Sequence, residues 1–352
     1  MLQLLRSLFA PKQPIHSDSV VTRSPPSSIS AGGTDDFSIT DNLLDANGLP
    51  VLDWHAAQQW VNGIVGETAQ GQAWSECEHA WLTHLREALG SEYQLRERGA
   101  ALLLSTLEDN VAEATLAFVN KTLQRVMRIL DGVAHVPEWG HDILIVFDDE
   151  DTYYQYVAHY YQEAGEFAGS GGMYINAGCG HFVTVKADLR AIEPVIAHEL
   201  THACLSHLPI PTWLNEGIAV NTERRLCPMP GSSATTPLQM HARHQKFWGP
   251  AEIQQFWSGE SFLRADEGNE LSYDLARIIV SQFGATWDHF RQFVLTASSE
   301  DGGASAAAEH LGVHLGDAIS ALLELELSAQ WEPNPVKWNG ASGQACFHTH
   351  FS

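Results

Sequence analysis

The segment Glu193-Pro-Val-Ile-Ala-His-Glu-Leu-Thr-His202 decides how the rest of the chain is interpreted. Its apolar residues recur at helical spacing, and Pro194 suits the first turn of a helix, where its missing N–H costs nothing. On such a helix His198 and His202 lie one turn apart on the same face, so both imidazoles can reach one metal ion. Glu199 projects about 100° round the helix from His198, which places it beside the ion instead of on it.

A third ligand is expected in the segment that follows. The helix should end at Pro209-Ile-Pro211, and Trp213-Leu-Asn-Glu-Gly-Ile-Ala-Val220 then begins a second helix. An acidic residue at the start of that helix can fold back toward the two histidines, and Glu216 has this position. The predicted metal ligands are therefore His198, His202 and Glu216.

Two imidazoles and one carboxylate, with a fourth position open, are typical of a catalytic zinc site, so Zn²⁺ is the predicted cofactor. Zinc lowers the pKa of a bound water to about 7 and polarises a carbonyl group. A carboxylate beside that water can take its proton, and Glu199 is the predicted general base. A structural metal site would need a fourth protein ligand, and only three are evident.

Two flanking segments fit a peptide-cleaving site. His181–Val185 has the pattern of a strand just upstream of the metal helix, so an extended peptide could pair with its edge. Ser272–Gly284 has the pattern of a helix, and it carries Tyr273, whose phenol could stabilise an oxyanion. Tyr273 fits an aromatic core position equally well, so both interpretations stay open.

The motif HELTH followed by WLNEGIA resembles the gluzincin metallopeptidases, and most closely the peptidase MA-like group, from about Ser91 to Leu327. The resemblance implies a zincin-like fold, with Glu216 as the third zinc ligand and Glu199 as the base. It also suggests that Tyr273 assists the transition state. The substrate would then be a peptide or a protein.

The sequence departs from the zinc aminopeptidases that share WLNEG. Thirteen residues separate His202 from Glu216, a shorter link than theirs, and Gly171-Gly-Met-Tyr-Ile-Asn176 replaces their GxMEN motif. Tyr174 stands where their amine-binding Glu would be. An endopeptidase is therefore favoured, with an aminopeptidase and a non-catalytic peptide-binding protein on the same scaffold as alternatives.

The periodicities predict an α+β protein in four parts. Residues 1–50, poor in large apolar groups, are expected to be a disordered tail. Residues 51–90 should form a helical segment divided by the glycine-rich stretch Gly63–Gly71. Residues 91–330 should hold a small mixed sheet, the metal helix and C-terminal helices, which the resemblance implies form a zincin-like catalytic domain. Residues 331–352 are expected to be an irregular tail.

The composition limits the partners. Of 352 residues, 44% are apolar, and 43 acidic against 19 basic side chains give a formal net charge of −24. Such a surface repels phosphate backbones and anionic lipid, so neither nucleic acid nor membrane is an expected partner. The five cysteines form no CxxC pair and no apolar run is long enough to span a membrane, which favours a cytoplasmic location.

The remaining candidate residues have simpler explanations. Four histidines near the motif are expected to be surface or hydrogen-bonded residues and not ligands: His181, His207, His241 and His244. Cys204 should face the core, because it lies two residues past a ligand on the helix. The acidic run Asp148–Asp151 is expected to cap a helix, with calcium binding as the minor alternative.

Overall fold

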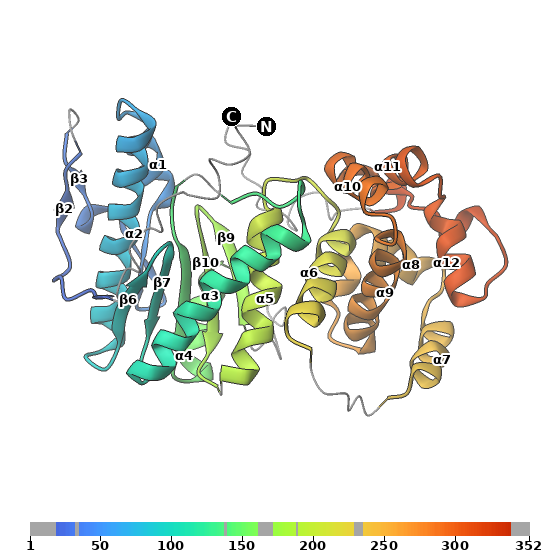
Figure 1. Cartoon of the computed structure of the whole chain (residues 1–352), viewed down its shortest axis with the longest axis horizontal. Coiled ribbons are helices and arrows are strands. Elements are labelled where there is room, and N and C mark those ends of the chain that lie inside the picture. The colour runs from blue at the N-terminus through green and yellow to red at the C-terminus, as the bar shows by residue number, and fades with distance from the viewer. Residues whose placement is uncertain are drawn as a thin grey trace, which may run out of the picture.

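The computed structural model describes residues 19–31, 35–136, 139–160, 172–187, 189–228 and 235–338 (Figure 1). These residues form twelve α-helices and a mixed six-stranded sheet, with two small two-stranded sheets beside it. The predicted α+β class is therefore confirmed.

The six-stranded sheet has the strand order β1-β6-β7-β8-β10-β9. The pairs β7–β8 and β8–β10 are parallel, and the other pairs are antiparallel. Its strands are β1 (Ser19–Val20), β6 (Gln94–Arg98), β7 (Ala101–Ser105), β8 (Asp142–Phe147), β9 (Gly172–Ala177) and β10 (Cys179–Val185). The small sheets consist of β2 (Ser28–Ile29) with β3 (Phe37–Ser38), and of β4 (Leu43–Ala46) with β5 (Leu49–Leu52).

The apolar runs of the central strands are buried on both faces of the sheet. Leu102 and Ile143 belong to the core on one face, whereas Leu103 and Leu144 belong to the core on the other. Alternate side chains of a strand point to opposite faces, so an uninterrupted apolar run requires cover on both. The segment around residues 100–107, whose pattern suits either a strand or a helix, is strand β7 for this reason.

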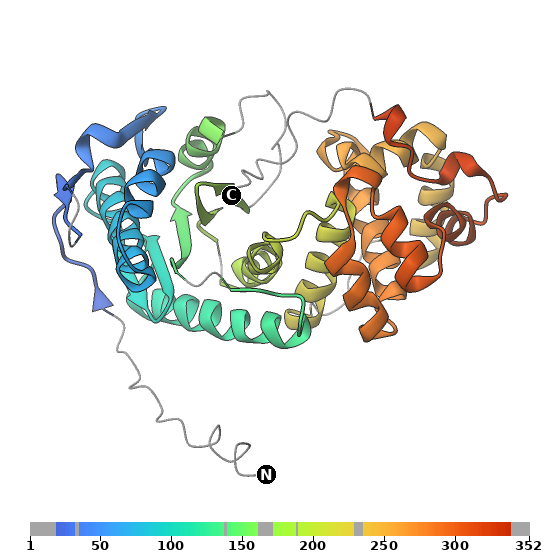
Figure 2. The same cartoon turned by 90° about the horizontal axis from the view of Figure 1, so that it is seen from above.

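Helices supply that cover. The core on one face includes residues of α1, α2 and α4, and the core on the other includes residues of α3 and α5. Seen from above, α3 runs along one side of the molecule from the sheet toward α6, and α5 lies between the two ends (Figure 2). The bounds are α1 (Trp54–Asn62), α2 (Glu67–Leu89), α3 (Asp109–Ile129), α4 (Glu150–Tyr160) and α5 (Leu189–Leu205).

The C-terminal half is helical and has a core of its own around Trp213, Phe256 and Phe293 (Figure 1). Its helices are α6 (Thr212–Leu226), α7 (Pro237–Phe247), α8 (Pro250–Ser258), α9 (Glu267–Phe283), α10 (Trp287–Thr296), α11 (Ala304–Ala306) and α12 (Leu315–Leu323). The end of α5 also packs into this core, so α5 joins both halves.

The prediction of a disordered tail up to residue 50 is wrong for the described residues 19–31 and 35–50. β1 extends the main sheet, and Ile29, Phe37 and Ile39 are buried in the same core as residues of α1 and α2. A few apolar residues are enough to order this segment, because they pack into a core that is formed mainly by later segments. Residues 1–18 and 32–34 lie outside the described part, as do residues 339–352 of the predicted C-terminal tail.

Three local expectations also need correction. The helical segment 51–90 breaks at residues 63–66, where Gly66 has φ +98°, and not as far as Gly71. α5 begins at Leu189, so Pro194 lies inside it and not in its first turn. The expected edge strand, β10, is paired on both sides, and β9 is the edge strand instead.

No helix in the described part of the chain is long and apolar enough to cross a membrane.

Candidate metal centre

Helices α5 and α6 hold the predicted ligands. α5 is fixed by Ile196 and Leu200, which pack against the sheet, and by Cys204, which is buried in the C-terminal core as expected. α6 follows the break at Pro209–Pro211 and is anchored by the fully buried Trp213. The two helices pack against each other, so the polar face of α5 meets the first turns of α6.

The three ligand atoms form a nearly equilateral triangle. Nε2 of His198 lies 3.1 Å from Nε2 of His202, and Oε2 of Glu216 lies 3.2 and 3.3 Å from them. Ligands at about 2.0–2.1 Å from a tetrahedral zinc ion lie about 3.3 Å apart. The triangle therefore has the dimensions of one face of a tetrahedral site, and His198, His202 and Glu216 could hold a metal ion.

Neighbouring side chains fix both imidazole rings. Nδ1 of His198 lies 3.1 Å from Oε2 of Glu223, and Nδ1 of His202 lies 3.0 Å from Oδ1 of Asn215. Each Nδ1–H can donate to these oxygen acceptors, which leaves each Nε2, a corner of the triangle, available to bind a metal ion. Such outer partners commonly orient metal-binding histidines and raise their basicity.

Replacing Glu223 by alanine is expected to weaken metal binding, because the His198 ring loses its acceptor. Loss of such an outer partner typically costs about 10–100-fold in metal affinity. Glu223→Gln keeps an acceptor oxygen without the charge and should lie between the wild type and Glu223→Ala. Competition with a chromophoric zinc chelator measures the three dissociation constants, and equal values would remove Glu223 from the site.

The electrostatics of the triangle favour a cation. Burial alone would lower the pKa of His198, but hydrogen bonds with Glu216 and Glu223 outweigh it and raise the pKa to about 10. Burial would likewise raise the pKa of Glu216, yet the two histidines hold it far below its ordinary value. The carboxylates thus create a negative potential at the two Nε2 atoms. The ligand side chains remain 13–17% exposed, so a small ion can enter.

Glu199 is buried beside the triangle. Burial raises the pKa of its carboxyl group, His198 and His202 lower it, and Glu216 raises it again. The backbone N–H of Tyr174, on the edge strand β9, donates a hydrogen bond to Glu199 and also lowers its pKa. Glu199 therefore lies where α5 meets the edge strand of the sheet.

Gly217 allows α9 to approach the metal centre. A Cβ atom at Gly217 would lie 2.5 Å from Val280 and 2.6 Å from the Ala276 carbonyl oxygen, so a larger residue would push α9 away. The Asn221 amide also donates to the Arg277 carbonyl oxygen at 2.9 Å across the same contact. The glycine of the NEG sequence thus sets the distance between Glu216 and α9.

This close approach brings Tyr273 of α9 to the site. Its ring centroid lies 6.4 Å from that of His198. The negative charge of Glu216, together with burial and the charge of Glu199, raises the pKa of Tyr273 well above its ordinary value. The phenol therefore keeps its proton and can act as a hydrogen-bond donor.

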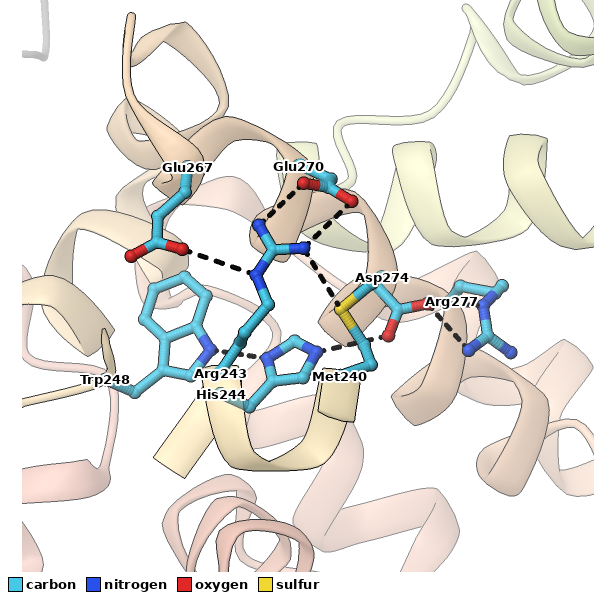
Figure 3. Close-up of polar contacts among 8 residues, drawn as sticks. All are labelled: Met240, Arg243, His244, Trp248, Glu267, Glu270, Asp274 and Arg277. Carbon is cyan, nitrogen blue, oxygen red and sulfur yellow. Dashed lines mark hydrogen bonds and ion pairs between the residues drawn. The ribbon is translucent and has the colours of Figure 1, made fainter. Parts of the chain in front are cut away.

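A polar network between α7 and α9 holds the helix that carries Tyr273 (Figure 3). The Trp248 indole N–H donates to Nδ1 of His244 at 2.8 Å, and Nε2 of His244 lies 3.1 Å from Asp274. Arg243 adds contacts to Glu267 and Glu270, both on α9. Figure 3 shows these side chains converging between the two helices. His244 is thus a buried, fully hydrogen-bonded histidine, as expected, and not a ligand.

The other sequence candidates lie away from the triangle. His181 is buried against Tyr156, and His207 is exposed at the end of α5. His241 belongs to α7 and lies 3.8 Å from Glu324. Asp149 caps the start of α4, where it accepts from the Thr152 N–H at 2.8 Å.

Sequence reasoning missed Asn215 and Glu223. Glu223 follows Glu216 by seven residues, or two helical turns, so the two share one face of α6. Asn215 directly precedes the third ligand. Helical spacing from Glu216 would have identified Glu223 as a second acidic residue facing the histidines.

No protein-family model matches the chain, and no curated protein has significant sequence similarity to it.

Proposed function

We propose that the chain is a zinc-dependent peptidase that hydrolyses internal peptide bonds. The observation that carries the proposal is the triangle of His198, His202 and Glu216, with ligand atoms 3.1–3.3 Å apart. A buried carboxylate, Glu199, lies beside it. The likeness of HELTH and WLNEG to the gluzincin motifs supports a zincin-like catalytic domain.

The donor set favours zinc among divalent ions. Two imidazoles with one carboxylate suit a borderline ion in a tetrahedral site, whereas magnesium and calcium prefer six or more oxygen ligands. With three protein ligands, a fourth position stays open for water or substrate. When bound there, zinc would lower the pKa of water and polarise the scissile carbonyl.

The protein groups have separate roles in this proposal. Glu199 takes the proton of the attacking water and can later pass it to the leaving amine. The Tyr273 phenol donates a hydrogen bond to the oxyanion that develops from the carbonyl oxygen. The free edge of β9, which reaches Glu199 through Tyr174, pairs with an extended peptide and aligns the scissile bond.

Replacing Tyr273 by phenylalanine is expected to lower kcat and to leave zinc content and KM nearly unchanged. A phenol donor would act mainly on the transition state, and loss of one such donor typically costs about 10²–10³-fold in kcat. Steady-state kinetics with a fluorogenic peptide provides the measurement. An unchanged kcat would make Tyr273 a packing residue beside Phe262, with which its ring is in contact.

Internal cleavage is the test of the proposed reaction. Purified full-length protein is incubated with a mixture of peptides, half of them N-acetylated, with and without a chelator, and the products are identified by mass spectrometry. We expect chelator-sensitive cleavage of acetylated and free peptides alike, because Tyr174 replaces the glutamate that would grip a free amine. Activity confined to free amines would indicate an aminopeptidase. Zinc binding without any cleavage would indicate a peptide-binding protein.

A further inference from the structure

A second cluster of metal-binding side chains lies on the α2 side of the sheet, away from α5 and α6. His79 belongs to α2, Glu97 to β6, and His141 directly precedes β8. One ligand atom from each of the three lies within 4.8 Å of the others. We propose that His79, Glu97 and His141 form a second site for a divalent transition-metal ion.

The hydrogen bond of Nδ1 turns the other ring nitrogen of His79, Nε2, toward Glu97. Its Nδ1 lies 2.8 Å from the Ser75 carbonyl oxygen, which can only accept, so the proton is on Nδ1. A neutral His79 ring then directs its Nε2 lone pair at Oε2 of Glu97, 3.2 Å away. A lone pair facing a carboxylate oxygen is repulsive unless a proton or a metal cation lies between them. That separation is close to the roughly 3.3 Å edge of a tetrahedral zinc site.

His141 is oriented in the same way by a buried carboxylate. Its Nδ1 lies 2.5 Å from Oε2 of Glu78, whose side chain is almost completely buried. Glu78 also accepts from the Trp74 indole N–H at 3.0 Å and from the His141 backbone N–H at 3.2 Å, so its orientation is fixed. With Nδ1 engaged, Nε2 is the nitrogen through which His141 would bind a metal. A carboxylate that orients a histidine in this way is the usual outer partner of a metal ligand.

Charge and access agree with this assignment. In the described part of the chain, Glu78 and Glu97 form ion pairs with histidines alone. A divalent ion held by two neutral imidazoles would balance the charge of −2 on Glu78 and Glu97. Glu97 is 36% exposed, and a cavity of about 430 Å³ has Glu78 and His141 in its wall, so an ion can enter from solvent.

An ion at this site would link α2, β6 and the start of β8. The rings of His79 and His141 already meet edge to face, with centroids 5.1 Å apart. Because the three ligand atoms lie at most 4.8 Å apart, an inward shift of about 1 Å by each of them would bring all three to bonding distance of one ion. The site would therefore stabilise the N-terminal half of the protein, independently of the proposed peptidase activity.

Zinc stoichiometry separates the two sites. Full-length protein freed of metal is dialysed against micromolar zinc, and bound zinc is measured by elemental analysis. We expect two ions in the wild type and one in Glu97→Gln, because a neutral amide is a poorer ligand than a carboxylate. Glu76→Gln, the same change at an exposed position of α2, is the matched control and should keep both ions.

The variant Glu216→Gln separates failure of this inference from failure of the proposed function. With the first site impaired, it should still bind one ion, and zinc should raise its Tm by a few degrees through binding to the folded state. Glu97→Gln/Glu216→Gln should bind none and show no such rise. If Glu97→Gln binds as much zinc as the wild type, the second site is refuted and the histidines form two ion pairs only. If Glu216→Gln still binds two ions, the proposed function fails while the second site stands.

Discussion

Replacing Glu199 by glutamine is expected to leave zinc in the protein and to reduce peptide hydrolysis by about 10²–10⁴-fold, the usual contribution of a general base. The amide fills the space of the carboxylate but cannot take the proton of the attacking water. Glu199 supplies none of the three ligand atoms of the triangle, so the metal should stay bound. Parallel measurement of zinc content and of kcat/KM provides the test.

The buried position of Glu199 calls for a matched control. Glu193→Gln makes the same substitution on the same helix, six residues earlier, and should retain activity. Circular dichroism and thermal unfolding of both variants establish that the fold is intact. If Glu199→Gln hydrolyses peptides at the rate of Glu193→Gln, Glu199 is not the base.

Replacing Glu216 by glutamine is expected to remove both zinc and activity at the first site. The carboxylate is the only anionic ligand of the triangle, and a neutral amide oxygen is a much poorer donor to a dication. The loss of activity should therefore follow the loss of the metal, and a large excess of zinc should restore part of it. Glu199→Gln should show no such rescue, because its metal is already bound.

The opposite pattern of metal loss would reverse the roles of the two glutamates. Retention of zinc by Glu216→Gln, together with loss of zinc from Glu199→Gln, would make Glu199 the ligand. Chelator competition on both variants, with Glu193→Gln as reference, distinguishes the two assignments.

The candidate site could be predicted best where the prediction depends on helical spacing alone. His198 and His202 are four residues apart on one continuous helix, and their rings lie side by side in the structure, with centroids 4.8 Å apart. Glu216 lies on the next helix after a short break, and so short a connection allows few positions of that helix relative to the histidines. The third ligand therefore followed from short-range geometry as well.

Features that depend on long-range packing were not predictable. Residues 35–50 have too few apolar groups to form a core, and they are ordered because Phe37 and Ile39 pack into one built by later segments. β9 is the edge strand because β10 lies between it and β8. The residue pattern of neither strand predicts this order.

The second histidine cluster shows the same limit. His79 and His141 are brought together by the packing of α2 against the sheet, and no local motif joins them to Glu97. Spacing along the chain can identify ligands within one helix or on adjacent helices. It cannot identify a site whose members lie 18 to 62 residues apart on separate elements.

The most direct test of the account is to locate the ion in the triangle. A crystal of zinc-loaded protein, measured on both sides of the zinc absorption edge, gives an anomalous difference map that shows zinc alone. We predict a peak about 2.0–2.2 Å from Nε2 of His198, Nε2 of His202 and a carboxylate oxygen of Glu216. A map with no peak among these three atoms would contradict the metal centre on which the proposed function rests.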